Sequence, residues 1–311
     1  MKFDKAAFRG IIPAAFLPMA GNEDIDWDTL RSYTDWLVGC GPCAVAFNME
    51  ASEVAALDAD EQLRVTAAVA ERVAGQIPVV SGLVAGSTRG ARAFAREHVA
   101  AGADALVVFP PLPTFLGQPL SVDMVYAYHS EIADAVPETP LIAFQMPRSY
   151  GAYYGADALK RLSSIPTLVG MKEASFDPAS FGEALTATRS EPDPIVLLTG
   201  SDTAILEYLV LGAEGALIGF AAIATDLNVA MWQASRDGDY VKAREIWDRL
   251  RPLATLCWGA PIRDMRPRMK EALVLAGIFA EATVRAPQLA VSAEEVKAIR
   301  HAMEQGDLLP R

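Results

Sequence analysis

The chain has 311 residues, of which 52% are hydrophobic, and its formal net charge at pH 7 is −12. This hydrophobic content excludes an intrinsically disordered chain. The acidic balance argues against binding to nucleic acid or to anionic membrane surfaces, because both require a basic face. The length suits two domains or one large α/β barrel, which typically needs about 250 residues.

Hydrophobic periodicity predicts strands that alternate with helices along most of the chain. The predicted strands are 10–16, 44–48, 78–81, 105–109, 141–145, 167–173, 195–199 and 215–220. The predicted helices between and after them are 27–38, 60–73, 88–100, 122–136, 156–162, 178–188, 203–211 and 227–235. Three more helices are predicted at 240–256, 268–279 and 293–305.

Eight β/α units in succession favour an α/β fold of the (β/α)8 TIM-barrel type with a C-terminal three-helix extension. The alternative, a doubly wound sheet, is disfavoured because no Gly-x-Gly-x-x-Gly turn follows the first strand. We expect a barrel over residues 1–236 and an extension over 237–311, without a Gly/Ser-rich linker between them.

Neither a secretion signal nor a membrane span is expected, because the first ten residues lack an apolar centre and the apolar runs are short or broken. A soluble, cytoplasmic protein is therefore expected. Cys40-Gly-Pro-Cys43 has the spacing of a redox motif. Such pairs begin a helix, whose dipole lowers the thiol pKa. Here the pair follows a predicted helix, which argues against redox chemistry.

The predicted sixth strand ends in Gly170-Met-Lys172-Glu173. A lysine at the end of a buried strand is costly unless it is paired or neutral. A neutral lysine amine can form a Schiff base with a carbonyl compound. The alternative is a partly exposed lysine paired to Glu173 or Asp202. The remaining lysines are expected near the N-terminus or on helix surfaces, at positions 2, 5, 160, 242, 270 and 297.

In such barrels the active site lies where the strands end and the βα loops begin. The residues at these predicted strand ends include no His/Cys cluster and no Asp/Glu set with metal-binding spacing, so no metal site is expected. The strand order places Phe144 beside Lys172, facing the barrel interior.

Several motifs, in order along nearly the whole chain, resemble those of the dihydrodipicolinate synthase / N-acetylneuraminate lyase family of Schiff-base aldolases. Residues 170–173 are similar to the family's Gly-x-Lys-[Asp/Glu] strand, and 198–202 with 209–215 are similar to its Gly-x-Asp and Leu-Gly-[Ala/Gly]-x-Gly segments. Residues 284–289 resemble its Arg-x-Pro segment. The resemblance implies a TIM barrel, an imine on Lys172, no further cofactor, and a homo-oligomer, a tetramer or dimer.

The chain departs from the family pattern at the second strand. The family reads Gly-Thr-Thr-Gly-Glu there, and its threonines hold the substrate carboxylate and relay a proton. This chain has Met49-Glu50-Ala51-Ser52-Glu53. Both hydroxyls are missing, and an acid stands where a carboxylate would be received, which like charges disfavour.

The fifth strand departs as well. The family's Tyr-Asn-x-Pro, with its acid/base tyrosine, is replaced by Phe144-Gln-Met-Pro147, and the carboxylate-binding arginine expected at Ser149 stands one place early, at Arg148. A partner tyrosine after the fourth strand is replaced near Pro111-Leu112. Lysine-pathway dihydrodipicolinate synthesis is therefore disfavoured.

We predict Lys172 and Glu50 as the catalytic residues. Glu50 would replace the missing hydroxyls as general acid/base, with a pKa raised by an apolar rim; the alternative is a structural ion pair, with Arg148 as its possible partner. The predicted substrate-binding residues are Ala51, Phe144, Arg148, Leu217 and Gly200.

Other residues are assigned supporting roles. Phe47, Phe144 and Leu217 would desolvate the amine and lower its pKa. Asp202 is expected to cap the following helix. The tyrosines at 150, 153 and 154 are alternative proton carriers, or else lid or interface residues.

The predicted function is a Schiff-base lyase, of aldolase or dehydratase type, that acts on a small 2-oxo acid or a related carbonyl compound. One alternative is a catalytically silent barrel that binds a carbonyl ligand. Another is 4-hydroxy-tetrahydrodipicolinate synthase, which Phe144, Glu50 and Ser149 disfavour.

Overall fold

The computed structural model describes residues 4–111 and 118–310. Eight parallel strands form one sheet in the order β1-β8-β7-β6-β5-β4-β3-β2. A parallel bridge joins Ala14 to Ala46, and the Ala15 N–H donates to the Ala46 carbonyl at 2.8 Å, next to β1 and β2. The ring of strands confirms the predicted TIM barrel and excludes the doubly wound sheet. The strands are β1 (Ile11–Pro13), β2 (Val45–Phe47), β3 (Val79–Leu83), β4 (Ala105–Val108), β5 (Leu141–Gln145), β6 (Leu168–Glu173), β7 (Val196–Thr199) and β8 (Gly215–Ile218).

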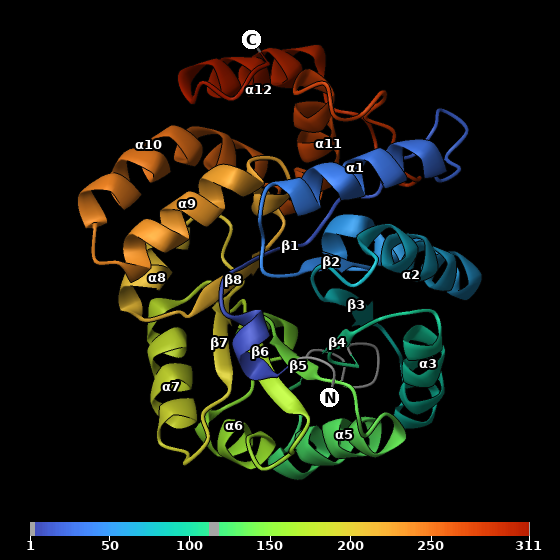
Figure 1. Ribbon diagram of the computed structural model, residues 1–311, viewed down its shortest axis with the longest axis vertical. Helices are drawn as coiled ribbons and strands as arrows, with labels where there is room; N and C mark the ends of the chain where they lie inside the picture. The colour runs from blue at the N-terminus through green and yellow to red at the C-terminus, as the bar shows by residue number, and fades with distance from the viewer. Residues whose placement is uncertain (1–3, 112–117, 311) are drawn as a thin grey trace.

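Every strand residue is buried, which explains the near-continuous apolar runs that predict these strands. Helices surround the ring, and several begin at a side chain that accepts a hydrogen bond from the first turn, such as Asp26, Asp58, Ser87, Ser121 and Asp177 (Figure 1). The surrounding helices are α1 (Trp27–Gly39), α2 (Ala59–Val73), α3 (Thr88–Ala100), α5 (Val122–Ala135), α6 (Ala156–Leu162), α7 (Pro178–Arg189), α8 (Ile205–Leu211) and α9 (Thr225–Arg236).

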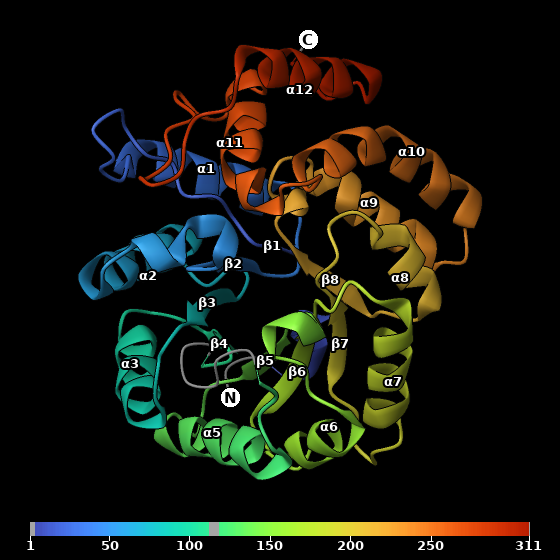
Figure 2. The same ribbon diagram turned by 180° about the vertical axis from the view of Figure 1, so that it is seen from behind.

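The C-terminal helices are α10 (Tyr240–Cys257), α11 (Met265–Leu275) and α12 (Ala293–Gln305), close to their predicted positions. They lie together beside α1 and α9 in both views of the molecule (Figures 1 and 2). α10 packs against α9 and α12, and α11 packs against α12. None of the described helices is both long enough and apolar enough to cross a membrane.

Lys270 on α11 corrects one prediction. The sequence predicts it on a helix surface, but its side chain is fully buried, forms an ion pair with Glu53, and donates to the Thr283 carbonyl at 2.6 Å. Glu53 also accepts from the Arg285 N–H at 3.0 Å. Glu53 is therefore a structural acceptor that joins the loop after β2 to the C-terminal segment.

Cys40 and Cys43 are free thiols that follow α1. Burial raises the pKa of Cys40 to about 11 and the pKa of Cys43 to about 12. The thiolate form needed for redox chemistry is therefore disfavoured in both.

Candidate active site

A cavity of about 350 Å³ lies where the strands end. Three parts of the chain line it. The barrel strands and the loops that directly follow them contribute Glu50, Ala51, Phe144, Lys172, Gly200 and Asp202. The loop after β5 contributes Met146, Pro147 and Tyr150, and the segment from the end of α10 to the start of α11 contributes Trp258, Ile262, Arg263, Met265 and Arg266.

Lys172 occupies the position predicted for it near the end of β6. It pairs in register with Phe144 on β5 and with Leu198 on β7, and only 7% of its surface is exposed. Its Nζ lies 4.5 Å from the centroid of the Phe144 ring, which packs edge-on against Phe109. The amine therefore borders the cavity on an aromatic wall.

Gly200, which follows β7, leaves room for the lysine stem. A Cβ atom at this position would lie 3.0 Å from Lys172 Cε and 2.6 Å from Ala174 Cβ. Both distances are too short for ordinary carbon contacts. Glycine at this position therefore lets the lysine stem pass beside the loop.

Burial lowers the pKa of Lys172 to about 8, and the negative charges of Asp202 and Glu50 partly oppose this shift. Within residues 4–111 and 118–310, the amine forms no ion pair and no hydrogen bond. At pH 7 a lysine with a pKa of about 8 is neutral roughly a tenth of the time, compared with well under a thousandth for an ordinary lysine. The arrangement thus favours a nucleophilic amine.

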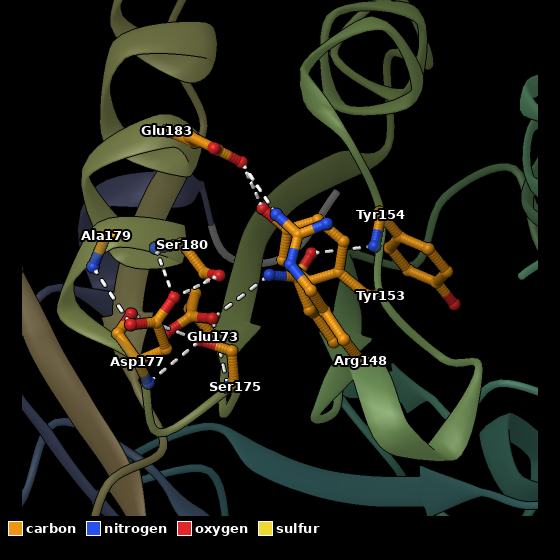
Figure 3. Close-up of polar contacts among 10 residues, drawn as sticks. Arg148, Tyr153, Tyr154, Glu173, Ser175, Asp177, Ala179, Ser180 and Glu183 are labelled. Carbon is orange, nitrogen blue, oxygen red and sulfur yellow. Dashed lines mark hydrogen bonds and ion pairs between the residues drawn. The ribbon is translucent and has the colours of Figure 1, made fainter.

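Glu173 faces away from this cavity and does not pair with Lys172. Its Oε1 accepts from Gln145 Nε2 and from the Ser175 N–H, both at 3.0 Å (Figure 3). Gln145 Oε1 in turn accepts from the Tyr154 N–H at 2.9 Å. These bonds hold the ends of β5 and β6 together and exclude the alternative in which Glu173 neutralises the lysine.

Arg148 does not line the cavity. Its guanidinium stacks over the ring of Tyr153 at 3.5 Å and donates to Glu183 Oε2 on α7 at 3.0 Å, while the Tyr153 hydroxyl donates to the same oxygen at 2.6 Å (Figure 3). The short 3-10 helix at Arg148–Tyr150 directs this side chain away from Lys172. The predicted role of Arg148 in substrate binding is not supported by this position, nor is its pairing with Glu50.

The ion-pair partner of Glu50 is Arg266, near the start of α11. Arg266 Nη2 donates to Glu50 Oε2 at 2.5 Å, and its Nε donates to the Glu50 carbonyl oxygen at 2.6 Å. The Glu50 side chain is 38% exposed. Glu50 is thus paired with a cation, instead of lying in the purely apolar rim that the sequence predicts.

Asp202 lies deeper than predicted. Its Oδ1 accepts the Phe220 N–H at 2.7 Å, and 7% of its surface is exposed. Ala204, not Asp202, is the N-cap of α8, so the predicted helix cap is wrong. Burial raises the pKa of Asp202 to about 7, although the Phe220 N–H and the Lys172 charge oppose this shift.

Two predicted contributors to the rim are absent from the described cavity lining. Leu217 pairs with Ile12 inside the barrel, and Phe47 is buried in β2. Leu112, near the expected site of the family's partner tyrosine, lies outside the described residues. In the described part of the chain, no three His, Cys, Asp or Glu side chains are grouped as ligands of a metal ion.

Sequence reasoning missed Arg266, which is 216 residues from Glu50 and belongs to no recognised motif. Trp258 and Arg263, which no motif places near the strand ends, also line the cavity. The signal that could have drawn attention to Asp202 is its position directly after a barrel strand, where catalytic groups concentrate.

Comparison with known proteins matches residues 7–306 to the model of the dihydrodipicolinate synthetase family. A 4-hydroxy-tetrahydrodipicolinate synthase of Nitrosococcus oceani is 29% identical over 303 residues, which are 97% of this chain and 99% of that protein. Its counterpart from Azoarcus sp. is 32% identical over 241 residues, or 78% and 80% of the two chains. The solved structure of chloride-inhibited dihydrodipicolinate synthase from Acinetobacter baumannii, complexed with pyruvate, has a TM-score of 0.86 at 24% identity and covers 97% of this chain and 100% of that one.

Proposed function

This chain belongs to the dihydrodipicolinate synthetase family and is a lyase of that family, and on this premise we propose that it forms a Schiff base between Lys172 and a small 2-oxo acid or a related carbonyl compound. The observation that carries the proposal is the amine of Lys172, which borders the cavity without an ion pair among the described residues and has a pKa lowered to about 8. The related A. baumannii enzyme, solved with pyruvate, supports a 2-oxo acid as the first substrate.

In the proposed reaction the neutral amine adds to the substrate carbonyl, and loss of water leaves a protonated imine. In the aldolase reaction this imine accepts the electron pair of the C–C bond that breaks. In the dehydratase reaction it accepts the electron pair of the C–H bond next to it, and the resulting enamine expels the hydroxyl group, which keeps the C–O electron pair and leaves as water once protonated. Phe144 forms the aromatic wall beside the nitrogen, Gly200 leaves room for the lysine stem, and Ala51 lines the cavity with a small side chain.

We propose that Glu50 transfers a proton to or from an oxygen atom of the substrate. In the aldolase reaction this is the carbonyl oxygen of the second substrate, and in the dehydratase reaction it is the oxygen of the leaving hydroxyl group. Arg266 occupies Oε2 and thereby fixes the orientation of the carboxylate. This geometry is typical of a base that is oriented by a second group. A substrate carboxylate would be repelled here, so we propose that it is not received at position 50.

The curated relatives carry the name 4-hydroxy-tetrahydrodipicolinate synthase, but three features disfavour that reaction in this chain. Phe144 lacks a hydroxyl, Ser149 stands where the resemblance implies an arginine, and Arg148 is bound to Glu183. We therefore propose an aldolase or dehydratase with a different carbonyl partner.

The family also supports three further proposals. We propose that residues 1–236 form the catalytic barrel and 237–311 an extension that completes its mouth. We propose a homo-oligomer, either a tetramer or a dimer, that works in the cytoplasm. The imine chemistry requires no cofactor beyond the lysine. Light scattering coupled to size-exclusion chromatography measures the assembly.

The proposal is tested by two parallel experiments. In the first, the protein is incubated with pyruvate, 2-oxobutanoate or 2-oxoglutarate and reduced with sodium borohydride to trap the imine. In the second, the same 2-oxo acids are combined with a panel of aldehydes, and product release is followed. An adduct together with turnover supports the lyase. An adduct without turnover supports the silent carbonyl-binding barrel. Absence of any adduct counts against both.

A further inference from the structure

Two carboxyl groups border the cavity beside Lys172, and their surroundings differ. Glu50 is paired with Arg266 and its side chain is 38% exposed. Asp202 is 7% exposed and, among the described residues, has no cation within ion-pair distance. The site therefore holds one carboxyl group that is paired with a cation and one buried carboxyl group that has no ion-pair partner among the described residues.

The position of Asp202 relative to Lys172 follows from two adjacent strands. β6 and β7 pair through Lys172 with Leu198 and Glu173 with Thr199, so the loop after Thr199 starts beside the lysine. Gly200 in this loop lies beside the lysine stem, since a Cβ at this position would lie 3.0 Å from Lys172 Cε, and Asp202 follows two residues later in the cavity lining. The Phe220 N–H, which follows β8, holds one oxygen of Asp202 at 2.7 Å. Two barrel loops thus fix this carboxyl group on the lysine side of the cavity.

Resting on the proposed Schiff base, we propose that Asp202 is the catalytic group that moves the C3 proton of the substrate bound to Lys172. In the forward step the Asp202 carboxylate takes a proton from C3 of the protonated imine. The C3–H electron pair becomes the C2=C3 double bond, and the C2=N π pair moves onto nitrogen. A neutral enamine and a protonated Asp202 result. In the cleavage direction, Asp202 returns the proton to C3 of the enamine.

This step leaves the total charge of the cavity unchanged, because the imine cation and the carboxylate neutralise each other as the proton moves. A buried site favours such a transfer, since no net charge has to be created in a desolvated environment. The pKa of Asp202, raised to about 7, is close to the value that suits a general acid/base at neutral pH.

The other candidates are less suited to this proton. Phe144 has no acidic hydrogen, and the Tyr153 hydroxyl donates to Glu183. Tyr150 lines the cavity but is 48% exposed, and it lies on the loop after β5 instead of directly after a barrel strand. Glu50 lies on the α11 side of the site, where Arg266 holds one of its oxygens. We therefore assign the two carboxyl groups to different protons, with Asp202 acting at C3 and Glu50 at the oxygen of the second carbonyl partner.

The experiment compares the wild type with Asp202→Asn in deuterium oxide, using pyruvate as the probe. Proton NMR follows the exchange of the pyruvate methyl hydrogens for deuterium, and borohydride trapping measures the imine in the same samples. The amide introduced by this substitution keeps an oxygen that can accept the Phe220 N–H, so the loop should be preserved. Thr203→Ala is the matched control, because Thr203 is exposed in the same loop.

We expect Asp202→Asn to form an amount of trapped adduct within about twofold of the wild type. We expect its exchange of the methyl hydrogens to be slower than that of the wild type by about a hundredfold or more. Thr203→Ala should change neither quantity, and Glu50→Gln should retain exchange. Wild-type exchange in Asp202→Asn overturns the assignment. Loss of the trapped adduct in Asp202→Asn, with the adduct retained in the wild type, also overturns the assignment, because Asp202 would then be needed for the structure of the pocket and not for proton transfer. Absence of an adduct in the wild type would instead overturn the Schiff-base function itself.

Discussion

Arg266 and Glu50 connect the C-terminal helices to the barrel at the candidate active site, through one side-chain bond of 2.5 Å and one bond to the Glu50 backbone of 2.6 Å. In the family pattern described above, a threonine in this segment offers its hydroxyl to the substrate carboxylate. This chain instead has Glu50, which is paired with Arg266 of α11. We therefore expect the residues that determine substrate preference to lie both in the loop after β2 and at the start of α11.

Glu50→Gln should lower turnover about a hundredfold or more, since the amide cannot accept a proton, and should leave imine formation measurable. The amide oxygen can still accept from Arg266, so little structural change is expected. Steady-state turnover and borohydride trapping measure the two quantities separately. Glu71→Gln, on the exposed face of α2, is the matched control. Unchanged turnover in Glu50→Gln would remove Glu50 from the mechanism.

Imine formation should depend on pH through Lys172. The amine must be neutral to attack, and burial lowers its pKa to about 8. The initial trapping rate with pyruvate should thus rise about tenfold per pH unit below 8 and level off above it. Cyanoborohydride trapping between pH 6 and 10 measures this profile. Phe144→Ala should admit water and move the midpoint upward. A wild-type midpoint near the ordinary lysine value of 10.5 would contradict the proposed role of burial.

Gly200→Ala should displace the lysine stem, because the added methyl would lie 2.6 Å from Ala174 Cβ and 3.0 Å from Lys172 Cε. Overpacking of this kind costs about 1–3 kcal/mol. We expect slower adduct formation with pyruvate and a lower urea midpoint. Gly182→Ala is the control, since a Cβ there meets nothing within 4 Å. Normal adduct formation in Gly200→Ala would show that the lysine stem can move aside freely.

Lys270→Met should destabilise the protein by about 3–5 kcal/mol, because it leaves the buried Glu53 without its cation. The double variant Lys270→Met/Glu53→Gln should recover part of this loss, since the neutral amide needs no counter-charge. Urea unfolding at pH 7 measures both variants. Equal stability of the wild type and the single variant would show that the pair does not hold the C-terminal segment to the barrel.

Local sequence predicts the barrel well because each strand and helix carries its own periodicity. It also places Lys172 beside Phe144, since both lie near the ends of consecutive strands. It fails where a side chain's surroundings come from distant segments. Lys270 is predicted on a surface, but its side chain is buried and pairs with Glu53 from the loop after β2. Arg148 stands one residue from the position that the resemblance implies, and the short helix after β5 directs it to Glu183 instead.

Among the described residues, Lys172 and Lys270 are the two buried lysines; Lys172 borders the cavity, whereas Lys270 forms an ion pair with Glu53. Mass mapping of peptides after borohydride reduction with pyruvate distinguishes them directly. The account predicts that the peptide containing Lys172 gains the mass of pyruvate less one water plus two hydrogens, and that Lys172→Met gains nothing. An adduct on the Lys270 peptide, or an unmodified Lys172 peptide in a protein that turns over 2-oxo acids, would contradict it.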